Sequence, residues 1–386
     1  MKQRLALLGS TGSIGKQTLD IVRRRPDEFE ITTLTAGNRW ESLVEQALEF
    51  RPDSVVIANE QHYGAVKEAL GNEPIKVYAG SDALSQVVAG GEVDTVVNAL
   101  VGYAGMLPSL AAVKASKRLA LANKESLVVA GEHIMREAAQ RNVPILPIDS
   151  EHSAIFQCLA GEVSAPRRVI ITASGGPFLR TPAEELERVT VAQALNHPNW
   201  SMGAKITIDS STLVNKGFEV IEARWLFGLS PEQIDVLVHP QSIVHSMVEF
   251  EDGAIKAQLG TPDMHLPIQY ALRFPDRGAL GEERLDFMKN PTLTFEPVDG
   301  ERFPLLGTAY DCLRRGGNSS CVMNGANEVA VAAFLSGQIK YTDIARVILG
   351  TLERAEWIAK PSIEDYAYSN DSSRRIAREI ISGLTK

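Results

Sequence analysis

Cysteine is scarce in this chain of 386 residues, and long apolar runs are missing. The three cysteines, Cys158, Cys312 and Cys321, are odd in number and far apart, which argues against a disulfide framework and a cysteine-based zinc site. No apolar run approaches the roughly 20 residues that a helix needs to span a bilayer. The first residues also lack the pattern of a signal or transit peptide. We therefore expect a reduced, cytoplasmic protein that does not use a membrane.

The chain also lacks an excess of basic residues. Lys and Arg total 39 against 48 Asp and Glu, which gives a formal net charge of −9. Nucleic-acid-binding proteins normally carry a basic patch or stripe, so this balance argues against nucleic acid as a partner. A small basic pocket for an anionic metabolite is still compatible with it. The length suggests two or three domains.

Short apolar runs alternate with segments of helical periodicity over the first 150 residues. This alternation is typical of βαβ units and predicts a parallel sheet. The runs are almost entirely apolar, as expected for strands covered on both faces. The expected strands are Arg4–Leu8, Glu30–Thr35, Ser54–Ala58, Ile75–Tyr78, Thr95–Asn98, Leu119–Ala122 and Val143–Ile148.

The pattern changes after Ser153. We expect a helix at His152–Ala160, a strand at Lys205–Ile208 and a long helix from Ser211 to about Phe227. Further strands are expected at Arg168–Thr172, Asp235–Val238, Ile243–Phe250 and Ala254–Leu259. Helices are expected at Pro304–Arg315, Val322–Leu335, Thr342–Trp357 and Ser372–Leu384. The predicted fold class is α/β, with an N-terminal Rossmann-like parallel sheet (1–149), a central α/β domain (150–274), a linker (275–299) and a C-terminal helical bundle (300–386).

A glycine-rich segment, Gly9 to Gly15, follows the first strand and opens the first helix. Its spacing is G-x-x-G-x-x-G, and its position is that of a phosphate-binding loop. Glycines allow the backbone to approach a pyrophosphate, and the helix start favours an anion. The alternative is a plain turn between strand and helix.

The end of the second strand indicates which dinucleotide is bound. The segment Thr35-Ala36-Gly37-Asn38-Arg39 has no carboxylate to bond a ribose 2′-hydroxyl. Arg39 could instead bind a 2′-phosphate through charge-assisted hydrogen bonds, which points to NADP(H). The alternative is that Arg39 is a solvated residue at a helix start.

Two carboxylates follow the last strand of the predicted sheet, in Asp149-Ser150-Glu151. In an extended chain residues two apart point the same way, so Asp149 and Glu151 would converge at the carboxyl edge of the sheet. Hard oxygen ligands suggest Mg²⁺ or Mn²⁺. The alternative is that Asp149 or Ser150 caps the helix that follows.

The helix after Asp209 offers a third carboxylate. Asn215, Lys216 and Glu219 share one face at helical spacing, so Glu219 could be a metal ligand while Ser210, Asn215 and Lys216 bind an oxyanion. The alternative is a solvated Lys–Glu pair.

Three further polar segments stand at ends of strands or in loops. Asn123-Lys124-Glu125 follows one strand, and Ser174-Gly175-Gly176 forms a turn suited to a phosphate. The loop from His197 to Gly203 carries Trp200, which is either a substrate lid or an anchor to the core.

Together these segments resemble the 1-deoxy-D-xylulose 5-phosphate reductoisomerase family. The resemblance covers essentially the whole chain and keeps the family's order of motifs. One mild departure is Gly325, where the family would have alanine. The motifs that carry the resemblance are Gly9–Gly15, Asn123–Ser126, Asp149–Ser153, Ser174–Phe178, His197–Gly203, Asp209–Thr212 with Asn215–Glu219, His239–Ser242 and Asn324–Val329.

The resemblance implies NADPH- and metal-dependent conversion of 1-deoxy-D-xylulose 5-phosphate to 2-C-methyl-D-erythritol 4-phosphate in the non-mevalonate isoprenoid pathway. It also implies a homodimer that fosmidomycin inhibits, with residues 150–274 as the catalytic and dimerisation domain. The implied metal ligands are Asp149, Glu151 and Glu219, and Lys124 and His197 join them as catalytic residues. The implied substrate contacts are Lys124, Ser150, Glu151, Ser174, His197, Trp200, Ser210, Asn215, Lys216 and Glu219. The implied cofactor contacts are Thr11, Gly12, Ser13, Ile14, Gly37, Asn38, Arg39, Asn123, Glu125 and Gly203.

Two other functions are alternatives to a reductoisomerase. A plain NADP oxidoreductase of the semialdehyde dehydrogenase kind usually needs a nucleophilic cysteine or a different base, and we expect no exposed cysteine near the motifs. A dinucleotide-binding sensor without catalysis would leave Asp149, Glu151 and Glu219 unexplained.

Overall fold

The structure is a computed structural model, and it describes residues 2–200, 202–281 and 284–384. The chain forms two compact units. The first comprises Met1–Ser126, Glu132–Ser153 and Asp263–Glu282, and the second comprises Leu127–Gly131, Ala154–Pro262 and Glu283–Lys386. Each unit is assembled from discontinuous segments, whereas the domains expected from the sequence were consecutive. Those domain boundaries stay a prediction.

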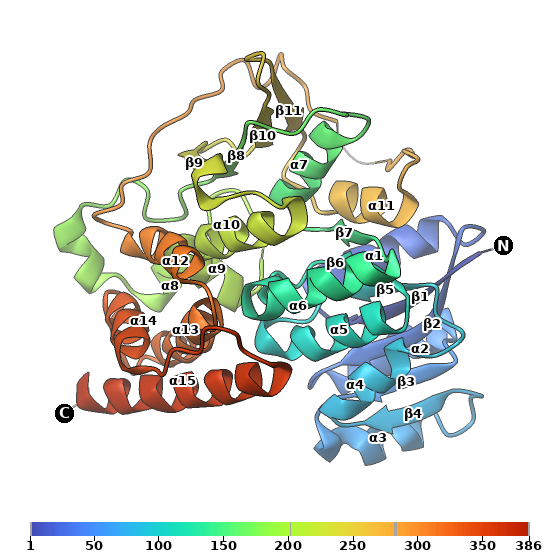
Figure 1. The fold of residues 1–386 in the computed structure, drawn as a ribbon. Helices are drawn as coiled ribbons and strands as arrows, with labels where there is room; N and C mark the ends of the chain where they lie inside the picture. Colours follow the sequence, from blue (N-terminus) through green and yellow to red (C-terminus); the bar gives the residue numbers. More distant parts are fainter. Residues whose placement is uncertain (1, 201, 282–283, 385–386) are drawn as a thin grey trace. The chain divides into compact units, whose positions relative to one another are not determined.

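The first unit is built on a seven-stranded parallel sheet with the order β4-β3-β2-β1-β5-β6-β7 (Figure 1). The strands are β1 (Gln3–Leu8), β2 (Phe29–Ala36), β3 (Ser54–Ile57), β4 (Lys76–Ala79), β5 (Thr95–Asn98), β6 (Arg118–Leu121) and β7 (Ile145–Pro147). All seven predicted strands are confirmed within a residue or two. The inner strands such as β3 and β5 are fully buried between helical layers, whereas the edge strand β4 is partly exposed. The strand order reverses between β1 and β5, which is where open parallel sheets bind their ligands.

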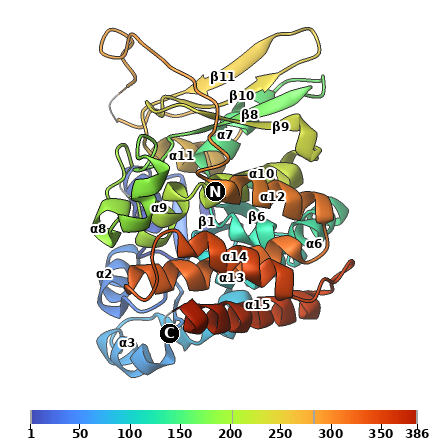
Figure 2. The same cartoon turned by 90° about the vertical axis from the view of Figure 1, so that its left-hand side faces the viewer.

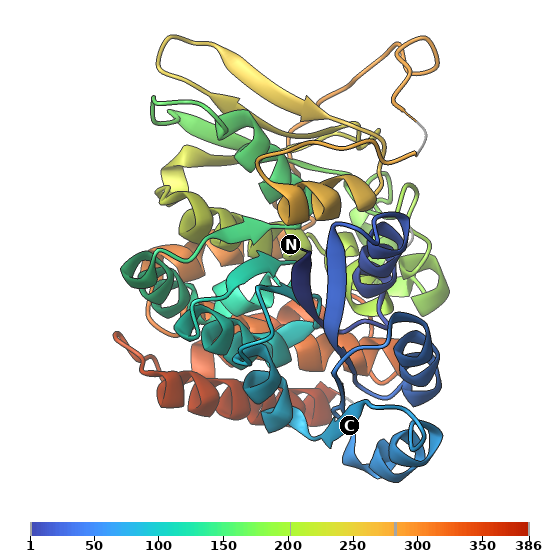
Figure 3. The same cartoon turned by 90° about the vertical axis from the view of Figure 1, so that its right-hand side faces the viewer.

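Helices cover both faces of this sheet. Figure 3 shows the blue helices from the first part of the chain on one side of the strands and the teal helices on the other. The helices of the first unit are α1 (Ser13–Arg24), α2 (Trp40–Phe50), η1 (Glu60–His62), α3 (Tyr63–Ala69), α4 (Ser81–Val88), η2 (Gly102–Gly105), α5 (Met106–Lys114), α6 (Glu125–Arg141) and α11 (His265–Arg273). Of these, α6 is kinked at Ala130, and its residues Leu127–Gly131 belong to the second unit.

The second unit contains a four-stranded mixed sheet with the order β11-β10-β8-β9 (Figure 2). Its strands are β8 (Arg168–Ala173), β9 (Ile234–Val238), β10 (Val244–Glu249) and β11 (Ile255–Leu259). β8 runs parallel to β9 and antiparallel to β10, and β10 pairs antiparallel with β11. The four strands predicted here are confirmed. β11 forms one edge of the sheet, and its first three residues are exposed.

The helices of the second unit surround one hydrophobic core, in which the Phe218 side chain is fully buried. They are α7 (Ser150–Leu159, which begins in the first unit), η3 (Ala183–Arg188), α8 (Val191–Ala194), α9 (Ala204–Ser211), α10 (Val214–Phe227), η4 (Pro231–Gln233), α12 (Pro304–Arg315), α13 (Ser319–Leu335), α14 (Asp343–Arg354) and α15 (Ile363–Leu384). The last four confirm the predicted helical bundle. No helix among the described residues is both long and apolar enough to cross a bilayer.

The strand predicted at Lys205–Ile208 is wrong, because this segment lies inside helix α9. Four apolar and polar residues in alternation cannot by themselves distinguish a strand from one turn of a helix. Two helical contacts decide the outcome here. The Thr207 hydroxyl donates to the Gly203 carbonyl (2.9 Å), and Lys205 pairs with Asp209 one turn later (2.8 Å).

Candidate functional site

The glycine-rich segment forms a tight turn at the end of β1. Gly9 has a φ of +78°, and a Cβ atom there would lie 2.6 Å from the carbonyl oxygen of Ala99. A Cβ atom on Gly15 would collide with the carbonyl oxygen of Gly9. The Gly12 N–H donates to the Gly9 carbonyl (3.0 Å) and closes the turn. This is therefore a backbone conformation that requires glycine, placed at the N-terminus of α1 where an anion is favoured.

The turn after β2 lies next to this loop in the sheet order. Gly37, Asn38 and Arg39 are all exposed, and Arg39 immediately precedes α2. The Asn59 side-chain amide donates to the Asn38 side-chain oxygen (2.9 Å), which holds the turn. An exposed arginine at this strand end is available to a 2′-phosphate. It also fits the alternative of a solvated residue at a helix start.

The segment after β6 forms a buried hydrogen-bond network. The Asn123 amide donates to the Gly102 carbonyl and to the Glu125 carboxylate, each at 3.0 Å. Its side-chain oxygen accepts the Ser126 N–H (3.0 Å). Every hydrogen-bonding group of Asn123 is thus occupied within the protein, which fixes the backbone that carries Lys124. The predicted cofactor residues Asn123 and Glu125 are nearly fully buried.

Lys124 and Asp149 form an ion pair between the ends of the neighbouring strands β6 and β7. Their side chains are only 6% and 12% exposed. A buried carboxylate needs a positive partner, because desolvation of an isolated charge is expensive. The structure therefore brings together two predicted site residues that lie 25 positions apart in the sequence.

The local geometry expected for Asp149 and Glu151 is wrong. We expected an extended chain that directs both carboxylates the same way, but α7 begins at Ser150. The Asp149 carbonyl accepts the Ser153 N–H (2.8 Å), so Asp149 stands at the N-cap position and Glu151 lies in the first helical turn. The Ser150 hydroxyl donates to the Glu151 carboxylate (2.5 Å). The helix-start alternative is thus correct for the backbone.

The third predicted carboxylate is buried at the start of α10. The Asn215 amide donates to Glu219 Oε1 and the Lys216 ammonium donates to Glu219 Oε2, both at 2.5 Å. Lys216 also donates to the Thr172 carbonyl at the end of β8 (2.6 Å). The expected shared face of the three residues is confirmed. The alternative of a solvated pair is wrong, because the Lys216 and Glu219 side chains are 5% and 1% exposed.

The Ser174–Gly176 turn packs against the end of α9. Gly175 and Gly176 have φ values of +84° and +67°, and a Cβ atom on Gly176 would lie 2.9 Å from the Ser210 carbonyl oxygen. Between α9 and α10, Leu213 adopts φ +59°, a rare conformation for a bulky residue. Strained backbone of this kind persists where the surroundings enforce it, often at functional sites. The turn thus lies against Ser210, and Lys216 of α10 reaches the Thr172 carbonyl two residues before Ser174.

The C-terminal segment holds the end of α9, and the sequence analysis did not predict that role. The Asn327 amide on α13 donates to the buried Asp209 carboxylate (2.9 Å). The Tyr341 hydroxyl donates to the Ser211 carbonyl (2.6 Å). Asn327 belongs to a motif that supported the family resemblance, but its partner lies 118 residues earlier in the chain. Sequence periodicity contains no signal for such a contact.

The His197 imidazole lies beside Ser174, with 2.9 Å between His197 Nε2 and Ser174 Oγ. Burial lowers the pKa of His197 to about 4, so the imidazole is neutral near pH 7. The Trp200 ring is half-buried and lies 6.2 Å from the His245 ring, centroid to centroid. Gly203 is exposed at the N-cap of α9. The predicted lid also includes Ser201, which lies outside the described residues.

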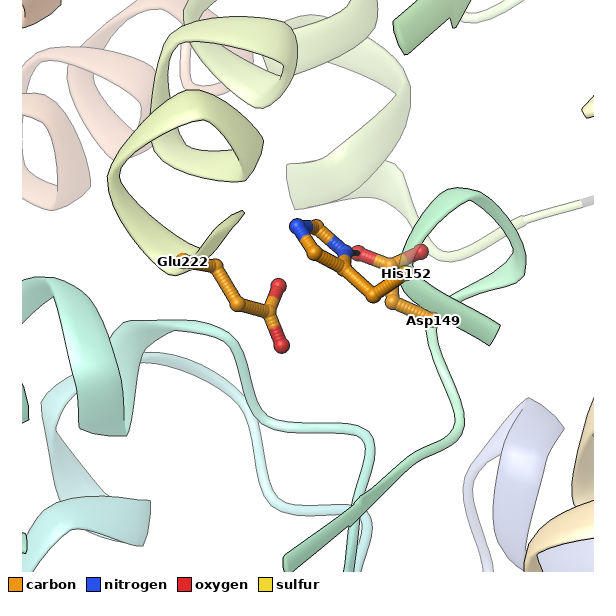
Figure 4. Close-up of side chains that lie close together, drawn as sticks. All are labelled: Asp149, His152 and Glu222. Atoms are coloured by element: carbon orange, nitrogen blue, oxygen red, sulfur yellow. Dashed lines mark ion pairs between the residues drawn. The ribbon is translucent and has the colours of Figure 1, made fainter. Parts of the chain in front are cut away.

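Two sets of side chains among the described residues are candidate ligands for a metal ion. One is the predicted set of Asp149, Glu151 and Glu219, and the other is Asp149 with His152 and Glu222. Figure 4 shows the second set, in which Asp149 and His152 come from the start of α7 and Glu222 comes from α10. The sequence analysis missed His152 and Glu222. The spacing could have identified them, because each lies three residues after a predicted ligand. Residues three apart lie on the same face of a helix.

The cysteines do not supply a nucleophile. All three are buried free thiols. Burial raises the pKa of Cys158 to about 11 and those of Cys312 and Cys321 to about 12. Since only the thiolate is an effective nucleophile, these groups are inert near pH 7. The finding agrees with the argument against a semialdehyde dehydrogenase.

Comparison with known families gives three matches in sequence order. The model of 1-deoxy-D-xylulose 5-phosphate reductoisomerase matches residues 5–131, that of its C-terminal domain matches residues 145–227, and a further model of the DXP reductoisomerase C-terminal domain matches residues 259–376. A relative with this enzyme name from Bacteroides thetaiotaomicron is 58% identical over 381 residues, which is 98% of each chain. A relative of the same name from Chlorobium chlorochromatii is 51% identical over 378 residues, 98% of this chain and 99% of that one.

Solved structures agree with these matches. The reductoisomerase from Zymomonas mobilis in complex with NADPH is 42% identical, covers 99% of each chain and has a TM-score of 0.92. A DOX-P reductoisomerase in complex with NADPH, fosmidomycin and magnesium is 39% identical, with a TM-score of 0.96 over 100% of this chain and 99% of that one. Agreement of motifs, sequence and fold along nearly the whole chain shows that it belongs to the 1-deoxy-D-xylulose 5-phosphate reductoisomerase family.

Proposed function

We propose that this chain converts 1-deoxy-D-xylulose 5-phosphate to 2-C-methyl-D-erythritol 4-phosphate, using NADPH and a divalent cation, in the non-mevalonate route to isoprenoids. The observation that carries the proposal is the set of carboxylates held by buried lysines. Lys124 pairs with Asp149, and Lys216 pairs with Glu219. A plain dehydrogenase has no need for two buried acid–lysine pairs, whereas a metal-assisted rearrangement of a ketose phosphate uses both the carboxylates and the cations.

NADPH fits the first unit. The Gly9–Gly15 turn leaves no room for a Cβ atom and stands at the N-terminus of α1, as pyrophosphate binding requires. Arg39 is exposed at the end of β2, where a 2′-phosphate would be recognised. We assign the cofactor contacts to Thr11, Gly12, Ser13, Ile14, Gly37, Asn38, Arg39, Asn123, Glu125 and Gly203. The structures of relatives in complex with NADPH support NADPH as the cofactor.

A hard divalent cation fits the donor set of Asp149, Glu151 and Glu219. All three ligands are carboxylates, which Mg²⁺ and Mn²⁺ prefer over the mixed imidazole and carboxylate set. A relative in complex with magnesium supports the choice. When bound, the cation would polarise the ketone and stabilise negative charge on the substrate oxygens. His152 and Glu222 follow Asp149 and Glu219 by three residues each and are fully buried.

The substrate phosphate fits the uncharged donors and the lysine of the second unit. We assign its contacts to Ser174, His197, Ser210, Asn215 and Lys216, with Ser150 and Trp200 as further substrate contacts. Fixing the remote phosphate provides binding energy that positions the reacting carbons. A relative in complex with fosmidomycin and magnesium supports an organic anion as the ligand.

The carbon skeleton would break and rejoin by retro-aldol and aldol steps, followed by hydride reduction of the aldehyde. Lys124 would stabilise developing enolate charge, because its ammonium is buried beside Asp149. The His197–Gly203 loop would keep the two fragments in place between the steps. A loop that excludes water serves such a reaction, since the intermediates are reactive.

We infer that the enzyme works as a homodimer in the cytoplasm. The second sheet supports the dimer, because its edge strand β11 is exposed and includes Ile255 at 52% exposure. The three free thiols support a reducing compartment. Light scattering coupled to size-exclusion chromatography should give twice the mass of one chain, and the mass of a single chain would contradict the dimer.

The decisive experiment follows NADPH consumption with 1-deoxy-D-xylulose 5-phosphate. We expect turnover with Mg²⁺ or Mn²⁺, loss of nearly all turnover in EDTA, and recovery when the cation is added back. The product should be identified by mass spectrometry. Turnover that survives EDTA would favour a plain dehydrogenase, and NADPH binding without turnover would favour a dinucleotide sensor.

Arg39→Asp should weaken the use of NADPH. A charge-assisted hydrogen bond contributes about 1.5–3 kcal/mol, so the KM for NADPH should rise roughly 10- to 100-fold while that for NADH changes little. The matched control is Arg51→Asp, which makes the same charge change at the other end of α2. Kinetics with both cofactors provide the measurement. An unaltered NADPH/NADH ratio in Arg39→Asp would show that Arg39 is only a solvated residue at the helix start.

A further inference from the structure

Asn199 ties the loop that carries His197 and Trp200 to a turn of the second sheet. Its side-chain amide donates to the Pro240 carbonyl (2.6 Å) and to the Ser242 hydroxyl (3.0 Å). Pro240 and Ser242 lie between β9 and β10, and the Ser242 N–H donates to the His239 carbonyl (3.0 Å), so this turn is itself fixed. His197 and Asn199 are themselves half-buried.

The same loop determines which nitrogen of His197 carries the proton. The backbone N–H groups of Asn199 and Trp200 both donate to His197 Nδ1, at 3.2 and 3.0 Å. A nitrogen that accepts two N–H groups cannot carry a hydrogen, so the proton of the neutral imidazole is on Nε2. Burial of the ring disfavours the doubly protonated form as well. His197 Nε2–H therefore donates to Ser174 Oγ (2.9 Å).

With this arrangement the Ser174 hydroxyl can only donate a further hydrogen bond. Its oxygen accepts the His197 Nε2–H and also the Gly176 backbone N–H (3.2 Å). A hydroxyl has two acceptor lone pairs and one donor hydrogen, and these two contacts use both lone pairs. The next partner of Ser174 must therefore be an acceptor, such as an oxygen of a phosphate.

We propose that Asn199 is a positioning residue, which holds a one-way chain of hydrogen bonds from the loop backbone through His197 and Ser174 to the phosphate oxygen of the substrate. The inference rests on the proposed function for the identity of the substrate. In this chain of contacts His197 acts as a neutral donor rather than as a cation. The positive charge near the phosphate comes from Lys216, whose ammonium is fixed by Glu219 and the Thr172 carbonyl.

Kinetics of Asn199→Ala and Asn199→Asp test the tether. Asp keeps the shape of Asn but cannot donate to the Pro240 carbonyl, so both variants should behave alike. If losing the tether reduces the population of the competent loop to about one tenth, the KM for 1-deoxy-D-xylulose 5-phosphate rises about tenfold. The KM for NADPH should stay within about twofold of the wild-type value. The matched control is Asn196→Ala, which removes the same side chain from an exposed position three residues earlier.

Imidazole ¹⁵N chemical shifts provide a second measurement that does not depend on turnover. In histidine-labelled protein, with His197→Asn used for assignment, His197 Nδ1 should give the shift of an unprotonated nitrogen and Nε2 that of a protonated one. Asn199→Ala should move both toward the average of exchanging tautomers. A melting temperature close to that of the wild type excludes general unfolding as the cause.

The outcomes separate this proposal from the proposed function. A wild-type protein that does not turn over the ketose phosphate would contradict the function, while the ¹⁵N result would still test the tautomer. An active wild type with unchanged KM values in both Asn199 variants would overturn the positioning role. A protonated Nδ1 in the wild type would overturn the direction of the hydrogen bonds.

Discussion

Replacing Glu219 by glutamine should lower kcat by about 1,000-fold or more, because the variant removes a carboxylate from the proposed cation site. Glu219 is fully buried. Its two carboxylate oxygens accept hydrogen bonds from Asn215 and Lys216, which lie on the same helix, α10. Glutamine keeps the size of the side chain but leaves the Lys216 ammonium without its counter-charge. NADPH binding, measured by calorimetry, should stay within about twofold, because the glycine loop lies in the other unit.

Two further variants make the Glu219 result specific. Loss of the buried counter-charge could cost about 3–5 kcal/mol of folding free energy, so a melting curve must show that the glutamine variant is folded at the assay temperature. Glu219→Asp keeps the charge and should retain more activity than Glu219→Gln at saturating Mn²⁺. The control is Glu185→Gln, an exposed glutamate of the same unit. Turnover of Glu219→Gln equal to that of the wild type would refute the ligand role.

The parallel sheet could be predicted from the sequence because burial on both faces leaves a mostly apolar run for the inner strands such as β3 and β5. The same reasoning found the face shared by Asn215, Lys216 and Glu219, since the period of a helix fixes which side chains meet. Both are local patterns that depend on residues a few positions apart. Polar residues placed directly after strands were likewise informative, because parallel strands end at a common edge.

The wrong predictions arise where a short segment has two compatible structures. Lys205–Ile208 has an alternation that fits a strand, but the capping glycine and the Lys205–Asp209 pair make it helical. Asp149 and Glu151 were expected to converge through an extended chain, but α7 begins between them, and their carboxylates come together at the start of a helix instead.

Contacts between distant segments could not be predicted at all. The Asn327 bond to Asp209 and the Asn199 bond to Pro240 connect residues that only the tertiary fold brings together. Their residue types were visible in motifs, but their partners were not. The structure is therefore needed to identify the residues that position the side chains of the candidate site.

Lys124 combines two tasks that a substitution can separate. Its ammonium is nearly buried beside Asp149, so it neutralises a carboxylate in the resting protein and would stabilise negative charge on the substrate during the reaction. A preorganised cation in a site shielded from water acts without solvent reorganisation, which is why such groups have large effects on rate. The first task affects cation affinity, and the second affects kcat.

Lys124→Met should therefore lower kcat by about 100- to 1,000-fold, while the concentration of Mg²⁺ needed for half-maximal rate stays the same or falls. Methionine keeps the length of the stem but removes the charge, so Asp149 loses its competing partner and remains available to a cation. Lys124→Arg should recover little activity, because a planar guanidinium does not replace a compact ammonium at a crowded position. Lys114→Met, at an exposed position of α5, is the matched control. Full recovery of Lys124→Met at high Mg²⁺ would mean that Lys124 acts only by holding Asp149, since a group needed to stabilise the enolate cannot be replaced by saturating the cation site.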